Sequence, residues 1–212
     1  MPTPRATISD RLGRGFYATD ARTLAQRLLG CCLVRVTSPG ERFIGVIVET
    51  EAYLGVQDRA AHCYGGRRTP RVESMYGEPG TAYVYFTYGM HHCMNVVCGM
   101  ADEPTAVLLR AVEPVAGHVG MRANRASPRR RTPLRDVDLC SGPARLCQAF
   151  SIDRDLDGVD LCTDKRVFIA PSQGDTGRPV RVTARIGVES AGVWARRRLR
   201  FFFADSPHVS RR

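Results

Sequence analysis

Lysine is almost absent from this 212-residue sequence: of its 31 basic residues, only Lys165 is a lysine and the rest are arginines. Long hydrophobic runs are also missing, since no apolar stretch approaches the ~20 residues that a helix needs to cross a bilayer. The opening Met-Pro-Thr-Pro-Arg lacks the hydrophobic region of a secretory signal. These absences argue against a membrane protein, and we expect the chain to work inside the cell.

Cys-x-x-Cys pairs are absent too, although the sequence has eight cysteines. In an intracellular protein we expect these cysteines to be mostly small, buried and reduced. His62-Cys63 and His91-His92-Cys93 bring suitable zinc ligands together in the sequence. However, adjacent residues on a strand point to opposite faces of the sheet. We therefore expect no metal and no other cofactor.

The charge is strongly one-sided, with a net charge of +10 and a pI near 9.6. A polyanion is the partner that such a balance favours, and arginine suits phosphate through its planar fork. Residues 121–135 hold six arginines and no acid, and residues 196–200 hold four more. Either cluster alone could be a solvated face or a loop. Two clusters in one small domain favour DNA or RNA as the partner.

The most informative stretch is residues 43–62, where a buried strand runs into a group of polar residues. Phe43 to Val48 is apolar and β-branched, and period-2 alternation then places Glu49, Glu51 and Tyr53 on one face. Burial at the end of such a strand would raise the pKa of Glu51 and suit it to act as a general base. The alternative is that these acids are solvated residues at a strand end, and spacing alone leaves both interpretations open.

A hairpin and a third strand carry two further candidates. Residues 81–88 and 92–98 predict a β-hairpin with Tyr88 and Gly89 at its turn. An aromatic ring at a hairpin tip either inserts into something, such as a stack of bases, or folds back onto its own loop. Residues 105–112 predict a buried strand whose one charge, Arg110, needs a carboxylate partner, and Glu51 or Glu113 could supply it.

The remaining pattern is that of one domain over residues 1–212, rich in strands. Residues 1–17 are expected to cross the surface, and residues 54–80 to form a long functional loop. Asp20 can cap a helix that ends before Gly30, and Ser141-Gly142-Pro143 can start a second one. Further strands are predicted at 32–36, 166–170, 180–188 and 199–204, with a turn at 38–41.

Eight blocks of sequence, in the same order, resemble the 3-methyladenine (alkyladenine) DNA glycosylase family of the mammalian type. The blocks are VETEAYLG (48–55), Asp58 with AAH (60–62), GGRRTPR (65–71), PGTAYVYFTYGM (79–90), CMNV (93–96), VLLRAVEP (107–114), CSGPARL (140–146) and RIGV (185–188). The resemblance extends from about residue 24 to residue 210. With the strand pattern, it implies an α+β domain in which helices flank a curved, mostly antiparallel, open-barrel-like sheet with a protruding β-hairpin.

The resemblance also implies a role for each matching residue. Glu51 matches the general base, which deprotonates a water positioned by Arg110 and by the backbone carbonyl of Ile186. That water attacks the deoxyribose carbon after the base is turned out of the duplex. Tyr88 matches the residue that intercalates through the minor groove. The matching pocket residues are Tyr53, His62 and Tyr85, which stack the base, Asn95, which disfavours the amino group of guanine, and Leu108.

The implied enzyme is a monofunctional glycosylase in base excision repair, with no strand-nicking step. Such a step needs an amine, and Lys165 lies far from the matching blocks, although Pro2 would offer a secondary amine if Met1 were removed. The implied substrates are 3-methyladenine, 7-methylguanine, hypoxanthine and etheno-adenine, which the sequence does not rank. We expect a monomer that binds double-stranded DNA at the cytoplasmic nucleoid.

Three positions depart from the family pattern: Val72, Arg145 and His208 stand where Asn, Lys and Trp are usual. Two other interpretations stay open. One is a catalytically inactive nucleic-acid binder on the same fold, which a release assay on methylated DNA would separate. The other is a zinc-dependent nucleobase enzyme, which metal analysis would decide.

Overall fold

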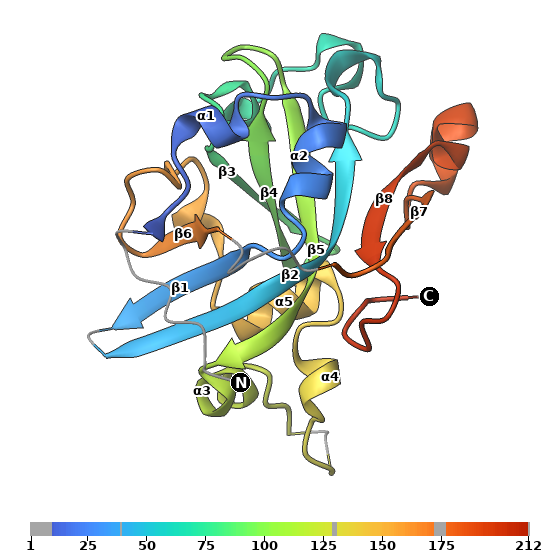
Figure 1. Cartoon of the computed structure of the whole chain (residues 1–212). Coiled ribbons are helices and arrows are strands. Elements are labelled where there is room, and N and C mark those ends of the chain that lie inside the picture. The colour runs from blue at the N-terminus through green and yellow to red at the C-terminus, as the bar shows by residue number, and fades with distance from the viewer. Residues whose placement is uncertain (1–9, 39, 129–130, 172–176, 212) are drawn as a thin grey trace.

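The structure, a computed structural model, describes residues 10–38, 40–128, 131–171 and 177–211 (Figure 1). The strands are β1 (Cys32–Ser38), β2 (Glu41–Tyr53), β3 (Ala82–Thr87), β4 (His91–Cys98), β5 (Thr105–Ala116), β6 (Val167–Ala170), β7 (Val180–Ala184) and β8 (Arg198–Phe203). The α-helices are α1 (Arg14–Tyr17), α2 (Ala21–Arg27), α3 (His118–Asn124), α4 (Asp136–Leu139) and α5 (Pro143–Ala149). Short 3-10 helices are η2 (Gly55–Gln57), η3 (Tyr64–Gly66), η4 (Glu73–Tyr76), η5 (Arg154–Leu156) and η6 (Glu189–Arg196).

The strands form one antiparallel sheet in the order β3-β4-β5-β2-β1-β6, which branches at β2. The first half of β2 pairs with β1, whereas Glu49, Thr50 and Glu51 pair with β8. The other edge of β2 pairs with β5 along most of its length, with register shifts beside Gly45 and Glu49. Such bulges bend a strand and increase its twist. The branch therefore lets the β7–β8 hairpin stand apart from the body, as Figure 1 shows.

Glu49 and Glu51 lie at this branch because the strand alternates as the sequence predicts. Val48 and Ala52 point into the main hydrophobic core, and the hydroxyl of Thr50 donates to the carbonyl of Ala25 in α2 at 2.8 Å. The two glutamates occupy the opposite face of β2 and are completely buried. On that face Glu49 is enclosed by Arg110, Arg200 and Ser210, and Glu51 by Tyr53, Arg110 and Ile186.

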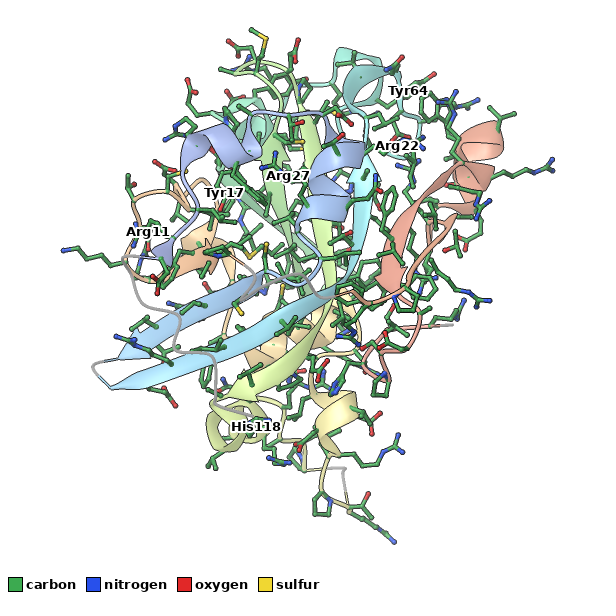
Figure 2. The ribbon with its side chains drawn as sticks, in the orientation of Figure 1. Arg11, Tyr17, Arg22, Arg27, Tyr64 and His118 are labelled. Carbon is green, nitrogen blue, oxygen red and sulfur yellow. The ribbon has the colours of Figure 1, made fainter. Side chains whose placement is uncertain are left out.

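The helices cover the apolar face of the sheet. Asp20 caps α2, since its side chain accepts hydrogen bonds from the backbone N–H groups of Arg22 and Thr23. Tyr17, labelled in Figure 2, is completely buried, and Arg27 covers the neighbouring ring of Phe16 at 4.2 Å. Because Tyr17 is in the core, the expectation that residues 1–17 cross the surface is wrong at its C-terminal end, while residues 1–9 lie outside the described residues.

The predicted fold class is confirmed: a curved antiparallel sheet with flanking helices and a hairpin that stands apart. Two element predictions need correction. The strand expected at residues 180–188 ends at Ala184, and Arg185 and Ile186 leave the sheet before Gly187, whose φ is 77°. The loop at residues 54–80 contains the 3-10 helices η2, η3 and η4. Within the described residues, no helix is long and apolar enough to span a membrane.

Candidate active site

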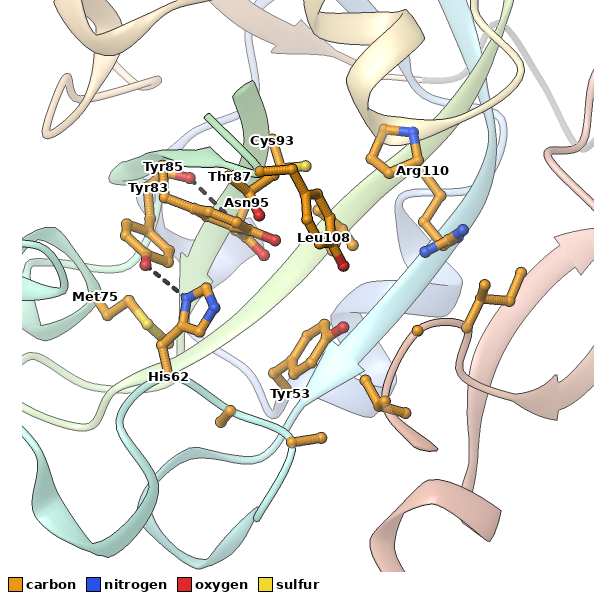
Figure 3. A pocket seen from close by; sticks show the side chains of 17 residues that line it. Tyr53, His62, Met75, Tyr83, Tyr85, Thr87, Cys93, Asn95, Leu108 and Arg110 are labelled. Atoms are coloured by element: carbon orange, nitrogen blue, oxygen red, sulfur yellow. Dashed lines mark hydrogen bonds between the residues drawn. The ribbon is translucent and has the colours of Figure 1, made fainter. Parts of the chain in front are cut away.

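A cavity of about 220 Å³ opens between the β3–β4 hairpin, the loop after β2 and the segment after β7 (Figure 3). Each wall comes from a different part of the chain, so the cavity exists only in the folded protein. Its lining includes Tyr53, Ala60, Ala61, His62, Met75, Tyr83, Tyr85, Thr87, Tyr88, Cys93, Asn95, Leu108, Arg110, Pro143, Ile186, Gly187 and Val188.

Aromatic rings form much of the wall. Tyr83 and Tyr85 stack with their centroids 5.3 Å apart, and His62 meets Tyr85 edge-on at 4.6 Å. Nδ1 of His62 lies 2.8 Å from the hydroxyl of Tyr83, and the amide of Asn95 donates to the carbonyl of Tyr83 at 3.2 Å. The first of these contacts orients the His62 ring and the second orients the Asn95 amide, as Figure 3 shows. The result is a slot suited to a flat, polarisable group.

His62 is held in its neutral form. Burial lowers its pKa to about 4, and the nearby positive charges of Arg71 and Arg67 act in the same direction. Above pH 5 the wall of the slot therefore carries no imidazolium charge. A cationic ring can enter without meeting a second cation at this position.

The Glu51 carboxylate lies directly behind the cavity wall and is held by three groups that line it. The backbone N–H of Ile186 donates to Oε1 at 2.8 Å, the hydroxyl of Tyr53 donates to Oε2 at 3.0 Å, and the guanidinium of Arg110 lies 3.3 Å from Oε1. Burial raises the pKa of Glu51 above its usual range, although Arg110 and the two hydrogen bonds oppose the shift. A partly desolvated carboxylate of raised pKa is a stronger base than an exposed one.

Arg110 is fixed by a second, completely buried carboxylate. Its Nε donates to Glu49 at 3.0 Å, and Glu49 also accepts from Nε of Arg200 at 2.7 Å and from the backbone N–H and hydroxyl of Ser210 at 2.6 and 2.8 Å. The predicted partner of Arg110 was Glu51 or Glu113. Glu51 is confirmed as a contact of Arg110, but the hydrogen-bonded partner is Glu49. Glu113 instead faces Arg178.

Tyr88 stands at the tip of the β3–β4 hairpin, where its side chain is 83% exposed. Tyr88 and Gly89 have φ angles of 51° and 66°, and the N–H of Met90 donates to the carbonyl of Thr87 at 3.3 Å. Two successive positive φ angles define a type I′ turn, which matches the twist of a hairpin. A bulky residue in this conformation is strained. The turn thus holds an exposed aromatic ring at the mouth of the cavity.

Comparison with known proteins agrees with this geometry. Residues 15–207 match the family model described as Methylpurine-DNA glycosylase (MPG). The chain belongs to the methylpurine-DNA glycosylase family. It is 47% identical over 207 residues to the DNA-3-methyladenine glycosylase of Mus musculus and 46% identical over 204 residues to that of Homo sapiens.

The lengths of these methylpurine-DNA glycosylase family members differ. The matches cover 95% and 94% of this chain but only 62% and 68% of the mouse and human proteins. A relative from Desulfitobacterium hafniense (strain Y51) is 44% identical over 94% of this chain and 98% of its own length. The shared region therefore corresponds to a nearly full-length bacterial relative.

The site residues predicted from the family resemblance converge on this cavity. Those that line it are Tyr53, His62, Tyr85, Tyr88, Asn95, Leu108, Arg110 and Ile186. Glu51 does not line the cavity and contacts it through the three groups that hold it. Sequence reasoning missed Tyr83, Cys93 and the role of Glu49. The period-2 pattern that links Glu49 to Glu51 is the signal that pointed to Glu49.

The two arginine clusters, at residues 121–135 and 196–200, are not continuous rows of exposed arginines that could all contact DNA phosphates. Arg200 is buried against Glu49, and Arg125 is also buried. Arg122 pairs with Asp136, and Arg135 pairs with Asp138 at 2.7 Å. Residues 129 and 130 lie outside the described residues. The interpretation as a solvated face or loop therefore does not fit Arg125 and Arg200, which are buried, and Arg122 and Arg135 carry acidic partners.

Seven of the eight cysteines are buried and all eight are free, which confirms that they act mostly as small buried residues. Within the described residues, no group of three or more His, Cys, Asp or Glu side chains could hold a metal ion. Of the departures from the family pattern, Val72 is buried beside Cys63 and Met75, and Arg145 donates to the carbonyl and hydroxyl of Ser141. His208 is buried.

Proposed function

We propose that this protein is a monofunctional DNA glycosylase that hydrolyses the N-glycosidic bond of damaged purines turned out of duplex DNA, as part of base excision repair. The proposed substrates are 3-methyladenine, 7-methylguanine, hypoxanthine and etheno-adenine. The observation that carries the proposal is the buried Glu51, held between Tyr53, Arg110 and Ile186 at the wall of an aromatic cavity. This places a base beside a slot for a flat ring.

In the proposed reaction Glu51 removes a proton from a water. An ionised carboxylate offers about four acceptor positions. Ile186 and Arg110 approach Oε1, whereas among the described residues the hydroxyl of Tyr53 alone approaches Oε2, so Oε2 has an acceptor position for the water. The oxygen–C1′ bond forms as the C1′–nitrogen bond breaks. The bonding electrons leave with the purine and the proton goes to Glu51. The guanidinium of Arg110 balances the buried charge.

The aromatic wall accounts for binding of alkylated purines. N-alkylated purines are cationic, and tyrosine faces attract cations by about 2 kcal/mol or more when desolvated. Tyr53, Tyr85 and the neutral His62 would stack the base, while Asn95 and Leu108 would limit its shape. A cationic purine is also a good leaving group. Damaged bases pair poorly, so turning them out costs less than the few kcal/mol that an intact pair needs.

Tyr88 supports the choice of duplex DNA as the partner. An exposed ring fixed at a hairpin tip beside the cavity can enter the space that the extruded base leaves. The net charge of +10 favours a polyanion and fast, salt-dependent association. We propose that the protein acts as a monomer on nucleoid DNA in the cytoplasm.

An excision panel on defined lesion duplexes tests the proposal. Wild-type protein should release damaged purines and leave an intact abasic strand. Glu51→Gln should keep its affinity for damaged DNA and lose excision by roughly 10²- to 10⁴-fold, the usual contribution of a general base. Undiminished turnover by Glu51→Gln would remove Glu51 from its role. Binding by the wild type with no purine release would favour the inactive binder, and activity that depends on bound zinc would favour the zinc enzyme.

A further inference from the structure

Behind the cavity lies a buried ion pair that joins two segments far apart in the sequence. Arg185, just after β7, donates to both carboxylate oxygens of Asp58 at 2.5 and 2.9 Å. Both side chains are completely buried, and their residues are 127 positions apart. Arg185 also donates to the carbonyls of Ala52 at 3.0 Å and Trp194 at 3.4 Å. A buried, bidentate pair with further bonds is a rigid connection.

Asp58 organises the loop that carries one wall of the cavity. Its Oδ2 accepts from the backbone N–H of Leu54 at 3.0 Å, and its Oδ1 accepts from that of Ala60 at 3.0 Å. Ala60, with Ala61 and His62 after it, lines the cavity. The pair therefore connects the loop bearing His62 to the segment that begins at Arg185.

Arg185 lies next to both residues that donate a hydrogen bond to Glu51, Tyr53 and Ile186. Its guanidinium carbon lies 4.7 Å from the centre of the Tyr53 ring, and the hydroxyl of that ring donates to Oε2 of Glu51. Its next residue in the chain is Ile186, whose N–H donates to Oε1. A shift of Arg185 would move both donors relative to the carboxylate, although Arg185 contacts neither the carboxylate nor the cavity.

We propose that Arg185, anchored by Asp58, is a positioning residue for the reaction: it sets where the Ile186 N–H and the Tyr53 hydroxyl meet the Glu51 carboxylate. This inference rests on the proposed glycosylase function. Lysine cannot replace arginine here, because an ammonium group cannot bind both oxygens of Asp58 in a planar fork while lying flat on the Tyr53 ring.

The proposal predicts a direction for the pH dependence. Burial raises the pKa of Glu51 while its two hydrogen bonds lower it, so loosening those bonds should raise the pKa further. The other titratable or charged groups that influence Glu51 are Glu49, Tyr53, Tyr85, Cys93 and Arg110. None of these is changed by a substitution at residue 185. The acidic limb of the pH–rate profile, where excision slows as Glu51 becomes protonated, should therefore move to higher pH.

The test compares Arg185→Lys with the wild type in single-turnover excision across pH. The matched control is Arg178→Lys, since Arg178 also contacts carboxylates, those of Glu113 and Asp205, and lies over the ring of Phe203 at 4.4 Å. We expect Arg185→Lys to lose on the order of 10²-fold in rate and to shift the acidic limb upward. Its affinity for a duplex with a tetrahydrofuran abasic analogue should change little. Arg178→Lys should match the wild type.

If Arg185→Lys has the excision rate of the wild type and an acidic limb at the same pH, the proposal is overturned. A rate that falls only in proportion to folded protein, with the limb unmoved, would also overturn it, because a merely structural residue does not alter the pKa of Glu51. If the lysine variant does not fold, Asp58→Asn carries the same test, since asparagine keeps one carbonyl oxygen for the loop. An NMR titration of the Glu51 carboxyl carbon reads the pKa without turnover. A wild type that releases no purine would refute the proposed function, and the titration would still decide the role of Arg185.

Discussion

Replacement of Glu49 by glutamine should lower the stability of the folded protein and shift the pH dependence of excision in a predictable direction. Glu49 is the common acceptor for Arg110, Arg200 and Ser210. The amide group of glutamine would place N–H groups against at least one of these donors, which costs about 1–3 kcal/mol for each unsatisfied buried donor. The change also removes the carboxylate with which the buried guanidinium of Arg200 pairs, while Arg110 keeps its contact with Glu51. Breaking a buried ion pair costs about 3–5 kcal/mol in total.

We therefore expect Glu49→Gln to lower the free energy of unfolding by about 3–5 kcal/mol, or the melting temperature by roughly 6–20 °C for a chain of this size. Urea unfolding measures the first quantity. Burial raises the pKa of Glu51, and the negative charge of Glu49 raises it further. Because glutamine removes that charge, the pKa of Glu51 should fall and the acidic limb of the excision rate should move to lower pH.

Glu113→Gln is the matched control for Glu49→Gln. Its carboxylate is 39% exposed and lies 3.5 Å from Arg178, so the loss should stay below about 1 kcal/mol. Equal losses in the two variants would refute the reasoning from burial. A limb that stays in place in Glu49→Gln would refute the electrostatic link between the two glutamates.

Three further results are expected. Tyr88→Gly should leave the free energy of unfolding within about 1 kcal/mol of wild type in urea unfolding, because relief of the left-handed strain offsets the entropy of glycine. The same variant should bind damaged duplex roughly 5- to 150-fold more weakly in filter binding, because it loses about 1–3 kcal/mol of stacking. His62→Phe should keep the acidic limb of excision, since a histidine whose pKa is about 4 does not titrate between pH 5 and 8, and a limb that disappears in the pH–rate profile would assign it to His62 instead. Borohydride treatment of the protein on abasic DNA should trap no covalent adduct, because Lys165 is exposed and does not line the cavity; an adduct lost in Lys165→Ala would show a strand-nicking amine.

Local features of this protein were predictable from its sequence because neighbouring residues encode them. Alternation along residues 43–53 placed Glu49, Glu51 and Tyr53 on one face, and both contacts of Arg110 and the Tyr53 hydrogen bond agree with that placement. The hairpin turn at Tyr88 and Gly89 follows from the strands that flank it. The family resemblance named eight of the residues that line the cavity.

The ion pairs that hold the site together are a property of the tertiary structure. Glu49 meets Arg110 across 61 residues because β2 pairs with β5. It meets Arg200 and Ser210 across 151 and 161 residues because β2 changes its partner on the other edge from β1 to β8 at the branch of the sheet. Asp58 meets Arg185 across 127 residues, because the chain leaves β7 early. Periodicity reports which face of a strand a residue occupies, whereas the partner on that face depends on how distant strands pair. The sequence alone therefore determined the strand faces, the turn and the family, and only the folded sheet decided which buried charges hold Glu51 in place.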